Sequence, residues 1–403
     1  MKPLCRPRLA VNLIGQLWCL SFLLAGMMAF PQSKGEKDRV YPFTSKSRLR
    51  PTQTKNCEGQ ASINQKLPRY RLEKSPAPVL GWRLSSINNL GQYTAYQGGS
   101  HLTSYPFYFA QGKSHDLSTF FTKDGVGVAI NNRGEIAGTR VTIIEKHGEM
   151  KSDEVYRSRA VLLRKGKLQD LGTLKNKDSS AVDLNDQGDV VGNADNGSGI
   201  DRAFLYHRGK VRGLGTLGGS SSQAHAINNK RQIVGNADTS QRTEEQIPIH
   251  HAFLWEKGKM HDLGTLGGEY SDALDINDRG EVVGFSWLKR KRGAGFVVRA
   301  FLYRQGKMKA LPTPAGWESR AFAINRSGDI VGMIFCQEKF LYHAALWSHG
   351  KVYDLNTLVS DKGGRNLESA DGMNDRGQIF GTSKDGLFLL TPYTEQKMEA
   401  TRE

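Results

Sequence analysis

The chain has 403 residues, of which 38% are hydrophobic and 9% aromatic, enough for one large folded domain or two to three average ones. Its 45 glycines show no collagen period, which excludes a collagen-type fibre and indicates many tight turns between short strands. The net charge of +16 is concentrated at the start, because residues 1–75 hold 14 Lys and Arg against 4 Asp and Glu, a net charge of +10.

Residues 1–30 predict an export signal. They begin with basic residues and continue with an uncharged run from Leu9 to Phe30, long enough to cross a bilayer. Both a cleaved signal peptide and a retained signal anchor fit this pattern, and we favour cleavage. Residues 31–68 then predict a basic flexible arm, either a solvated linker or a tether to anionic polymers or membrane headgroups.

Four cysteines are present, and Cys5 and Cys19 would leave with the signal. Export would permit a disulfide between the remaining Cys57 and Cys336. Two thiols not bonded to each other fit equally well, because the sequence does not fix the separation of the two Cα atoms. No cysteine spacing matches a zinc site, so we predict neither a metal nor a cofactor.

A short motif recurs seven times from about residue 84 onward. A strand-like run ends in Asn, a turn with Gly follows, and a second run ends near Val-Gly. The recurring asparagines are 43, 54, 43, 49, 48 and 49 residues apart, which points to a propeller or solenoid array. We predict that the following residues form structural turns, with glycine in the left-handed position: Asn88, Asn131, Asn185, Asn228, Asn277, Asn325, Asn374, Gly134, Gly188, Gly280, Gly328 and Gly377. Arg231 stands where one copy would carry this glycine, so its loop should differ or carry strain.

Each copy contains four short runs rich in Val, Ile, Phe and Tyr and no helical stripe. In one copy they span residues 272–277, 281–285, 299–303 and 307–311. A second tight turn, Gly-Lys, joins the third and fourth runs in six copies. The four runs therefore predict one antiparallel blade, and the looser stretch after the fourth run crosses to the next blade.

The seventh copy has only three such runs, at residues 370–374, 378–381 and 386–390. An unused strand stands before the first copy, at Arg69 to Leu72. Pairing it into the last blade would close the ring and protect both sheet edges. We therefore predict an all-β fold, a seven-bladed β-propeller of four-stranded antiparallel blades over residues 69–392, closed by the N-terminal strand, with a disordered tail at 393–403.

The middle copies resemble a known family. The segments His251-Ala252-Phe253-Leu254-Trp255 and Asp262-Leu263-Gly264-Thr265-Leu266-Gly267-Gly268 look like the HAF-type extracellular repeat. The resemblance extends over about residues 84–392 and weakens in the first and last copies. It implies a bacterial, exported protein and no established activity.

Two binding surfaces follow from this arrangement. The longest connections join the second and third strands and should lie on one face of the disk, where they either bind a ligand or are unselected solvated insertions. They span residues 139–158, 196–201, 239–250, 287–298 and 334–343. The opposite face should carry a ring of lysines that could bind an acidic polysaccharide or phosphate-rich polymer, or could simply solubilise the turns. These are Lys113, Lys167, Lys210, Lys259, Lys307 and Lys351.

A further repeated position precedes the third strand, and we interpret it as structural. It holds Arg159, Arg202, His251, Arg299 and His343, while Asp116, Asp170, Asp262 and Asp354 recur on the fourth strand. Adjacent antiparallel strands bring such residues together, so cross-strand ion pairs are expected in preference to a recognition ring.

We predict no catalytic residue. The best candidate group, Glu145, His147, Asp153, Glu154 and Tyr156, lies in one loop without a second wall. The cluster at residues 289–292 is interpreted as an exposed basic loop, and no nucleic acid is expected as a partner.

The prediction is thus an exported, monomeric, non-enzymatic module for binding or scaffolding, with an anionic glycan or cell-surface polymer as partner. The alternative is an extracellular polysaccharide-processing hydrolase or lyase with its site on the loop-rich face. The expected location is extracellular, at the cell surface or periplasmic, with membrane contact only through an uncleaved N-terminal segment.

Overall fold

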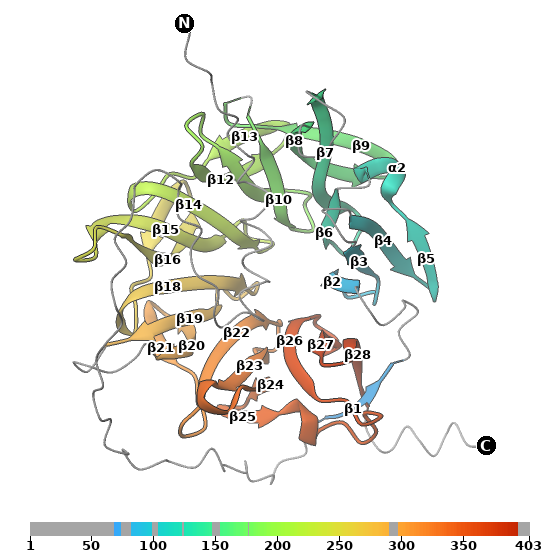
Figure 1. Ribbon diagram of the computed structural model, residues 1–403, viewed down its shortest axis with the longest axis vertical. Helices are drawn as coiled ribbons and strands as arrows, with labels where there is room; N and C mark the ends of the chain where they lie inside the picture. The colour runs from blue at the N-terminus through green and yellow to red at the C-terminus, as the bar shows by residue number, and fades with distance from the viewer. Residues whose placement is uncertain are drawn as a thin grey trace, which may run out of the picture.

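The computed structural model describes residues 68–73, 82–98, 104–122, 125–146, 154–175, 177–289 and 297–393. Seven sheets of four antiparallel strands are arranged around a central axis (Figure 1). The export signal, most of the arm, Cys57 and the tail after residue 393 lie outside the described residues. No helix in the described ranges has the length and apolar character needed to span a membrane.

Blades are numbered here by the order of their innermost strands. Blade 1 holds β2 (Trp82–Ile87), β3 (Tyr93–Gly98), β4 (Ser104–Ala110) and β5 (Lys113–Asp116), and blade 2 holds β6 (Val126–Ile130), β7 (Ile136–Lys146), β8 (Glu154–Arg164) and β9 (Lys167–Gly172). Blade 3 holds β10 (Ser179–Leu184), β11 (Val190–Asp195), β12 (Asp201–His207) and β13 (Lys210–Gly213), and blade 4 holds β14 (Gly218–Ile227), β15 (Ile233–Arg242), β16 (Pro248–Glu256) and β17 (Lys259–Asp262). Blade 5 holds β18 (Gly267–Ile276), β19 (Val282–Leu288), β20 (Val298–Arg304) and β21 (Lys307–Ala310), and blade 6 holds β22 (Glu318–Ile324), β23 (Ile330–Cys336), β24 (Leu341–Ser348) and β25 (Lys351–Asp354).

Blade 7 is built from both ends of the folded region. It holds β26 (Leu367–Met373), β27 (Ile379–Ser383) and β28 (Gly386–Tyr393), and β1 (Arg69–Leu72) pairs antiparallel with β28. The short blue strand β1 lies beside the red strand β28 in Figure 1. Tyr70 of β1 is buried, and its backbone N–H donates to the carbonyl of Leu358. The predicted seven blades and their closure by residues 69–72 are confirmed.

The hydrophobic core lies between neighbouring blades. The third strands of blades 3, 4, 5 and 7 each bury one phenylalanine completely: Phe204, Phe253, Phe301 and Phe388. In one core cluster, Val191 and Leu205 of blade 3 pack with Ile227, Phe253 and Trp255 of blade 4. Each blade therefore completes its core only against its neighbour, which is why a closed ring is needed.

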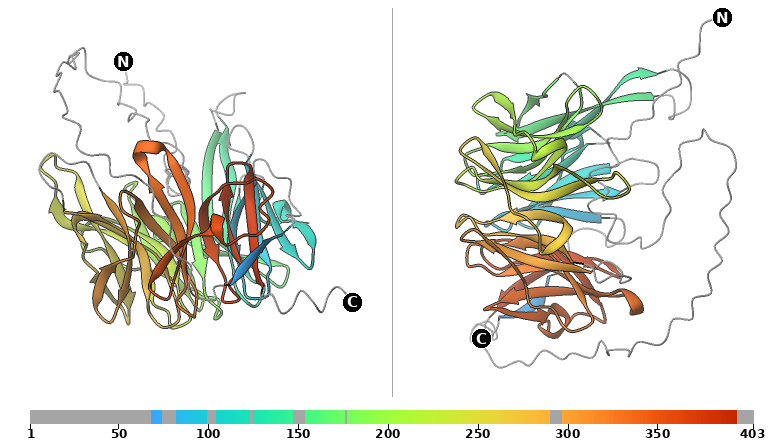
Figure 2. Two further views of the ribbon diagram at one scale, coloured as in Figure 1. Left: turned by 90° about the horizontal axis from the view of Figure 1, so that it is seen from below. Right: turned by 90° about the vertical axis from the view of Figure 1, so that its left-hand side faces the viewer.

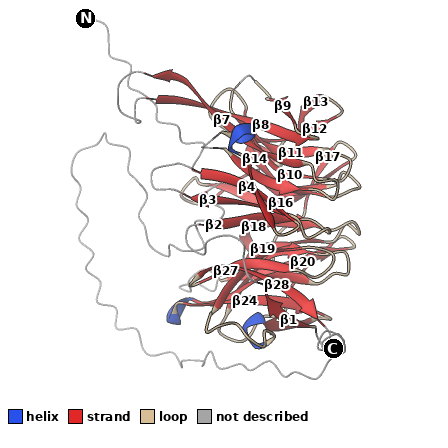
Figure 3. Ribbon diagram, turned by 90° about the vertical axis from the view of Figure 1, so that its right-hand side faces the viewer, coloured by secondary structure: helices blue, strands red, loops and turns tan. Residues whose placement is uncertain are grey.

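Within the described residues, helical structure is limited to three short segments, α2 (Ser118–Phe121), η2 (Gln337–Lys339) and η3 (Leu355–Thr357). Some of the long connections between second and third strands are partly extended hairpins. Strands β7 and β8 continue the ladder as far as the pair Lys146 and Glu154, and β15 and β16 pair as far as Arg242 and Pro248. The two strands β7 and β8 project beyond the disk in the side view (Figure 3).

Candidate functional site

Two faces of the disk are distinguished by their connections. Turns from first to second strand and from third to fourth strand lie on one face, here called the Asn-turn face. Connections from second to third strand and from blade to blade lie on the other, here called the loop face. Figure 2 shows the disk from two sides, with the longer hairpins gathered on the loop face.

The Asn-turn begins with an asparagine that uses both ends of its side-chain amide. In blade 5, Asn277 Oδ1 accepts the backbone N–H groups of Arg279 and Glu281, at 3.0 and 3.1 Å. Its Nδ2 donates to Glu281 Oε2 at 2.8 Å and to the carbonyl oxygen of Asn325 in blade 6 at 3.1 Å. An aspartate carboxylate could accept the backbone N–H groups of the turn, but it has no N–H to donate to the next blade. This difference explains why asparagine recurs at the position.

The turn geometry confirms the predicted role of the glycines. Gly134, Gly188, Gly280, Gly328 and Gly377 all have positive φ, between 73° and 93°. Arg231 adopts the same left-handed conformation, with φ of 59°, and keeps the same backbone hydrogen bond to Asn228. The turn with Arg231 therefore has the same shape as the turns with glycine. Its cost is backbone strain, because Arg231 is held in the left-handed conformation.

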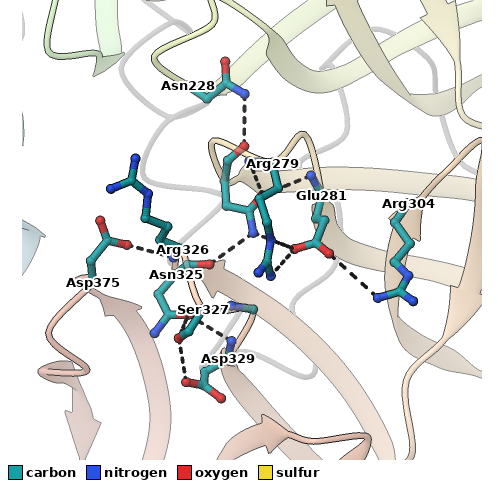
Figure 4. Close-up of polar contacts among 11 residues, drawn as sticks. Asn228, Arg279, Glu281, Arg304, Asn325, Arg326, Ser327, Asp329 and Asp375 are labelled. Atoms are coloured by element: carbon teal, nitrogen blue, oxygen red, sulfur yellow. Dashed lines mark hydrogen bonds and ion pairs between the residues drawn. The ribbon is translucent and has the colours of Figure 1, made fainter.

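These asparagines form a ring of links from blade to blade around the axis. The donor Nδ2 and the acceptor carbonyl pair as Asn88 to Asn131, Asn131 to Asn185, Asn185 to Asn228, Asn228 to Asn277, Asn277 to Asn325, and Asn374 to Asn88. The link from Asn325 to Asn374 is missing among the described contacts. Here Asn325 Oδ1 also accepts the Ser327 hydroxyl, and Ser327 reaches Asp329 as well (Figure 4).

The residues that follow these asparagines form a second ring, nearer to solvent. In it a backbone N–H donates to the side-chain Oδ1 in the next blade, at 2.8–2.9 Å. The donor and acceptor pairs are Asn89 to Asn132, Asn132 to Asp186, Asp186 to Asn229, Asn229 to Asp278, Arg326 to Asp375, and Asp375 to Asn89. The link from Asp278 to blade 6 is missing, because Arg326 offers no acceptor.

The two rings enclose a cup on the axis with a volume of about 200 Å³. Its lining includes the seven residues of the second ring, which carry three carboxylates, Asp186, Asp278 and Asp375, and one guanidinium, Arg326. The formal charge of this ring is therefore −2. In the part of the chain that the structure describes, no group of His, Cys, Asp or Glu side chains is arranged to hold a metal ion.

Two aspartates, Asp183 and the cup-lining Asp275, join the innermost strands of neighbouring blades. Asp183 Oδ2 accepts the N–H of Ile227 in the next blade, and Asp275 Oδ2 accepts that of Ile324, both at 2.8 Å. Burial raises the pKa of Asp183 to about 7 and that of Asp275 to about 6. Their positions are structural, since each carboxylate bridges two blades through backbone donors.

The six predicted lysines lie at the outer rim of the Asn-turn face, each as the first residue of an outermost strand. All six are exposed, and no ion pair to them occurs within the described ranges. The preceding two residues form a two-residue turn in which both have positive φ, for example Lys165 at 50° and Gly166 at 72°. This type I′ geometry matches the twist of the hairpin and points the lysine outward at the same place in each blade.

Sequence reasoning missed three further cations of this rim and the second ring of the cup. Lys165, Arg208 and Lys257 occupy the first turn position in blades 2, 3 and 4 and are exposed. We call these three and the six lysines the basic rim. The sequence did contain a signal for these three cations, because each directly precedes a turn glycine.

The second ring of the cup also has a signal in the sequence. An alignment of the seven copies places Asn or Asp at six of its positions and Arg at one.

The proposed cross-strand pairs form in three blades. His251 Nδ1 lies 2.8 Å from Asp262, His343 Nδ1 lies 2.7 Å from Asp354, and Arg159 Nε lies 4.0 Å from Asp170. Burial alone would raise the pKa values of Asp262 and Asp354, but the hydrogen bonds and charge of these histidines, together with neighbouring N–H donors, lower both below the usual value. Blade 3 lacks the pair, since its fourth strand (Lys210–Gly213) offers no carboxylate to Arg202.

The loop face gathers apolar side chains at hairpin ends. Ile143 is 53% exposed, Ile247 54% and Phe340 72%. Of the loop group considered for catalysis, His147 and Asp153 lie outside the described residues, and so do the side chains of Glu145 and Glu154. Cys336 is buried at the end of β23, and its pairing with Cys57 lies outside the described residues.

Comparison with known proteins identifies the architecture only. A family model described as "Protein of unknown function (DUF3466)" matches residues 107–267, less than half of the chain. No curated protein matches. The β-propeller domain of the Trilobed protease from Pyrococcus furiosus, described as having an open velcro topology, is 12% identical over 79% of this chain and 95% of that chain, with a TM-score of 0.52.

Two further solved structures are similar over most of this chain. The Pyrococcus horikoshii acylaminoacyl peptidase is 12% identical over 80% of this chain and 53% of that chain (TM-score 0.49), and TolB from Acinetobacter baumannii is 12% identical over 76% and 64% (TM-score 0.40). The chain thus spans about half and two thirds of these structures.

The resemblance to HAF-type repeats is wrong, because the matching family model is a different one. The structure gives the physical reason. Ala252 and Phe253 are fully buried, and His251 pairs with Asp262. The triplet thus reflects how a small residue, an aromatic residue and a cross-strand pair build a blade of this chain.

Proposed function

We propose that this chain is an exported, non-enzymatic binding module whose basic rim holds an anionic polymer outside the cytoplasm. A glycan with carboxylate or sulfate groups, or a phosphate-rich surface polymer, has the required chemistry. The observation that carries the proposal is the repetition of an exposed lysine at one place in six blades.

Multivalency supports this reading of the rim. A single exposed lysine binds an anionic group weakly in water, but a polymer that reaches several blades engages many at once. Blades 2, 3 and 4 place two cations on each turn, in the pairs Lys165 and Lys167, Arg208 and Lys210, and Lys257 and Lys259. The acidic cup lies inside the rim, so the polymer would follow the outer edge and not cross the axis.

The test is retention on a heparin column along a salt gradient. We expect the triple variant Lys167→Gln, Lys210→Gln and Lys259→Gln to elute at clearly lower salt than the unmodified chain. The matched control is Lys175→Gln, Lys289→Gln and Lys339→Gln, which removes the same charge from exposed positions on the loop face. Equal elution of the two triple variants would show that net charge alone retains the protein and would refute the proposal.

A further inference from the structure

The second ring of the cup is interrupted at one junction only. Six of its seven positions carry Asn or Asp, and six of its seven blade-to-blade hydrogen bonds form. At the junction of blades 5 and 6 the acceptor is replaced by Arg326. Among the described residues, the backbone N–H of Asp278 has no acceptor there.

Arg326 adds a second set of donors beside this unused N–H. Its backbone N–H bonds to Asp375, whereas no hydrogen bond or ion pair of its guanidinium occurs among the described residues. Figure 4 shows the Arg326 side chain with a dashed line only at its backbone nitrogen. The interruption therefore presents several donors and no acceptor, in a ring where every other junction has both.

An oxygen atom of a ligand would complete the ring at this point. It would accept the Asp278 N–H in place of the missing Oδ1, and a carboxylate could also accept from the guanidinium of Arg326 in the paired geometry typical of arginine. A hydroxyl would satisfy the N–H but would leave the charge of Arg326 unused.

The charges around the cup determine which kind of carboxylate ligand it can bind. Arg326 stands between Asp278 and Asp375 in the ring order, and Asp186 and the buried Asp275 also line the cup. A simple anion would be repelled by the carboxylates of the second ring, and a simple cation would be repelled by Arg326 and would leave the donors unmet. A molecule with both charges close together meets both requirements.

We propose that the cup binds a small zwitterion, a single α-amino acid, with its carboxylate on Arg326 and the Asp278 N–H and its ammonium on the flanking carboxylates. The volume of about 200 Å³ suits a ligand of this size and is small for an oligosaccharide. This site is separate from the basic rim, so either proposal can fail alone.

The test is titration calorimetry of the full chain with L-serine, acetate and methylammonium. We expect the unmodified protein to bind L-serine at millimolar concentration or below and to bind neither single-charge probe measurably. Arg326→Asn should weaken L-serine binding by at least about ten-fold. The control Arg376→Gln, which removes a neighbouring exposed arginine outside the cup lining, should leave the affinity within about two-fold of the original.

Three results would overturn the proposal. They are no heat of binding for L-serine at ten millimolar or so, equal binding of acetate and L-serine, or unchanged affinity in Arg326→Asn. Heparin retention of Arg326→Asn, which keeps all nine cations of the basic rim, should stay close to that of the unmodified chain.

Discussion

Blade 6 and the other six blades use the same Asn-turn differently. From blade 1 to blade 4, every turn donates at least two hydrogen bonds to the next blade on the Asn-turn face, and in blade 5 only the N–H of Asp278 is left without its acceptor in blade 6. Blade 6 receives a link from Asn277 but passes none on from the Asn325 side chain. The first ring thus loses its link between blades 6 and 7, and the second ring loses its link between blades 5 and 6. The repeated turn is a structural device in the other blades, and blade 6, which borders both missing links, is where recognition can be added.

The largest expected effect compares the two kinds of junction directly. Asn277→Asp would place a carboxylate against Glu281 Oε2 and the Asn325 carbonyl, where two hydrogen bonds are now donated. We expect it to lower the free energy of unfolding by about 3 kcal/mol, because buried acceptors would face one another. Asn325→Asp, which breaks no link to blade 7, should cost about 1 kcal/mol. Urea unfolding of both variants measures the difference, and equal losses would refute the distinction.

The next prediction concerns the aspartates that pin the inner strands. The pKa of Asp183 is raised to about 7 in the folded protein, above the unfolded value of about 3.9. Between these values the folded state binds more protons than the unfolded state, so this group makes stability fall as pH rises from about 4 to 7.

Asp183→Asn stays uncharged over this range. The fall in unfolding free energy between pH 4 and 7 should become smaller by on the order of 2 kcal/mol. Asp275, with a pKa raised to about 6, also makes the unfolding free energy fall with rising pH, and it does so in both the unmodified chain and Asp183→Asn. Thermal unfolding at half-unit pH steps gives the two slopes, and parallel curves would contradict the assignment.

The smallest effect isolates the strain at Arg231. This residue has φ of 59° and pairs through Nε with buried Asp189 at 2.7 Å. Arg231→Gly and Arg231→Ala both remove the ion pair, but only glycine also removes the strain. We expect the glycine variant to be more stable than the alanine variant by about 1 kcal/mol. If the two melt at the same temperature, the left-handed conformation costs nothing at this position.

Most of the fold could be predicted because its determinants are local and repeated. The turn asparagines, the left-handed glycines and the Gly-Lys turns each specify a hairpin, and the missing fourth strand of blade 7 pointed to residues 69–72. The extended hairpin of β7 and β8 was not predicted. Polar residues such as Thr142 and Arg157 leave its sequence without a clear alternation of apolar and polar residues.

The candidate site was less accessible to sequence reasoning. The six lysines of the rim can be recognised in the sequence because they occupy the same position of the repeat. The cup forms only when seven turns, 43–54 residues apart in the chain, meet on the axis. Each Asx residue after the turn asparagine is unremarkable alone. The significance of Arg326 depends on the N–H of Asp278, which lies 48 residues earlier in the chain.

Arg326 interrupts the second ring of hydrogen bonds because its side chain has no acceptor for the Asp278 N–H. Equilibrium unfolding of Arg326→Asn and Arg326→Ala tests this explanation most directly, because both remove the guanidinium and only asparagine can accept the Asp278 N–H. The asparagine variant should be more stable than the alanine variant by about 1 kcal/mol. Equal stability of the two variants would contradict the account.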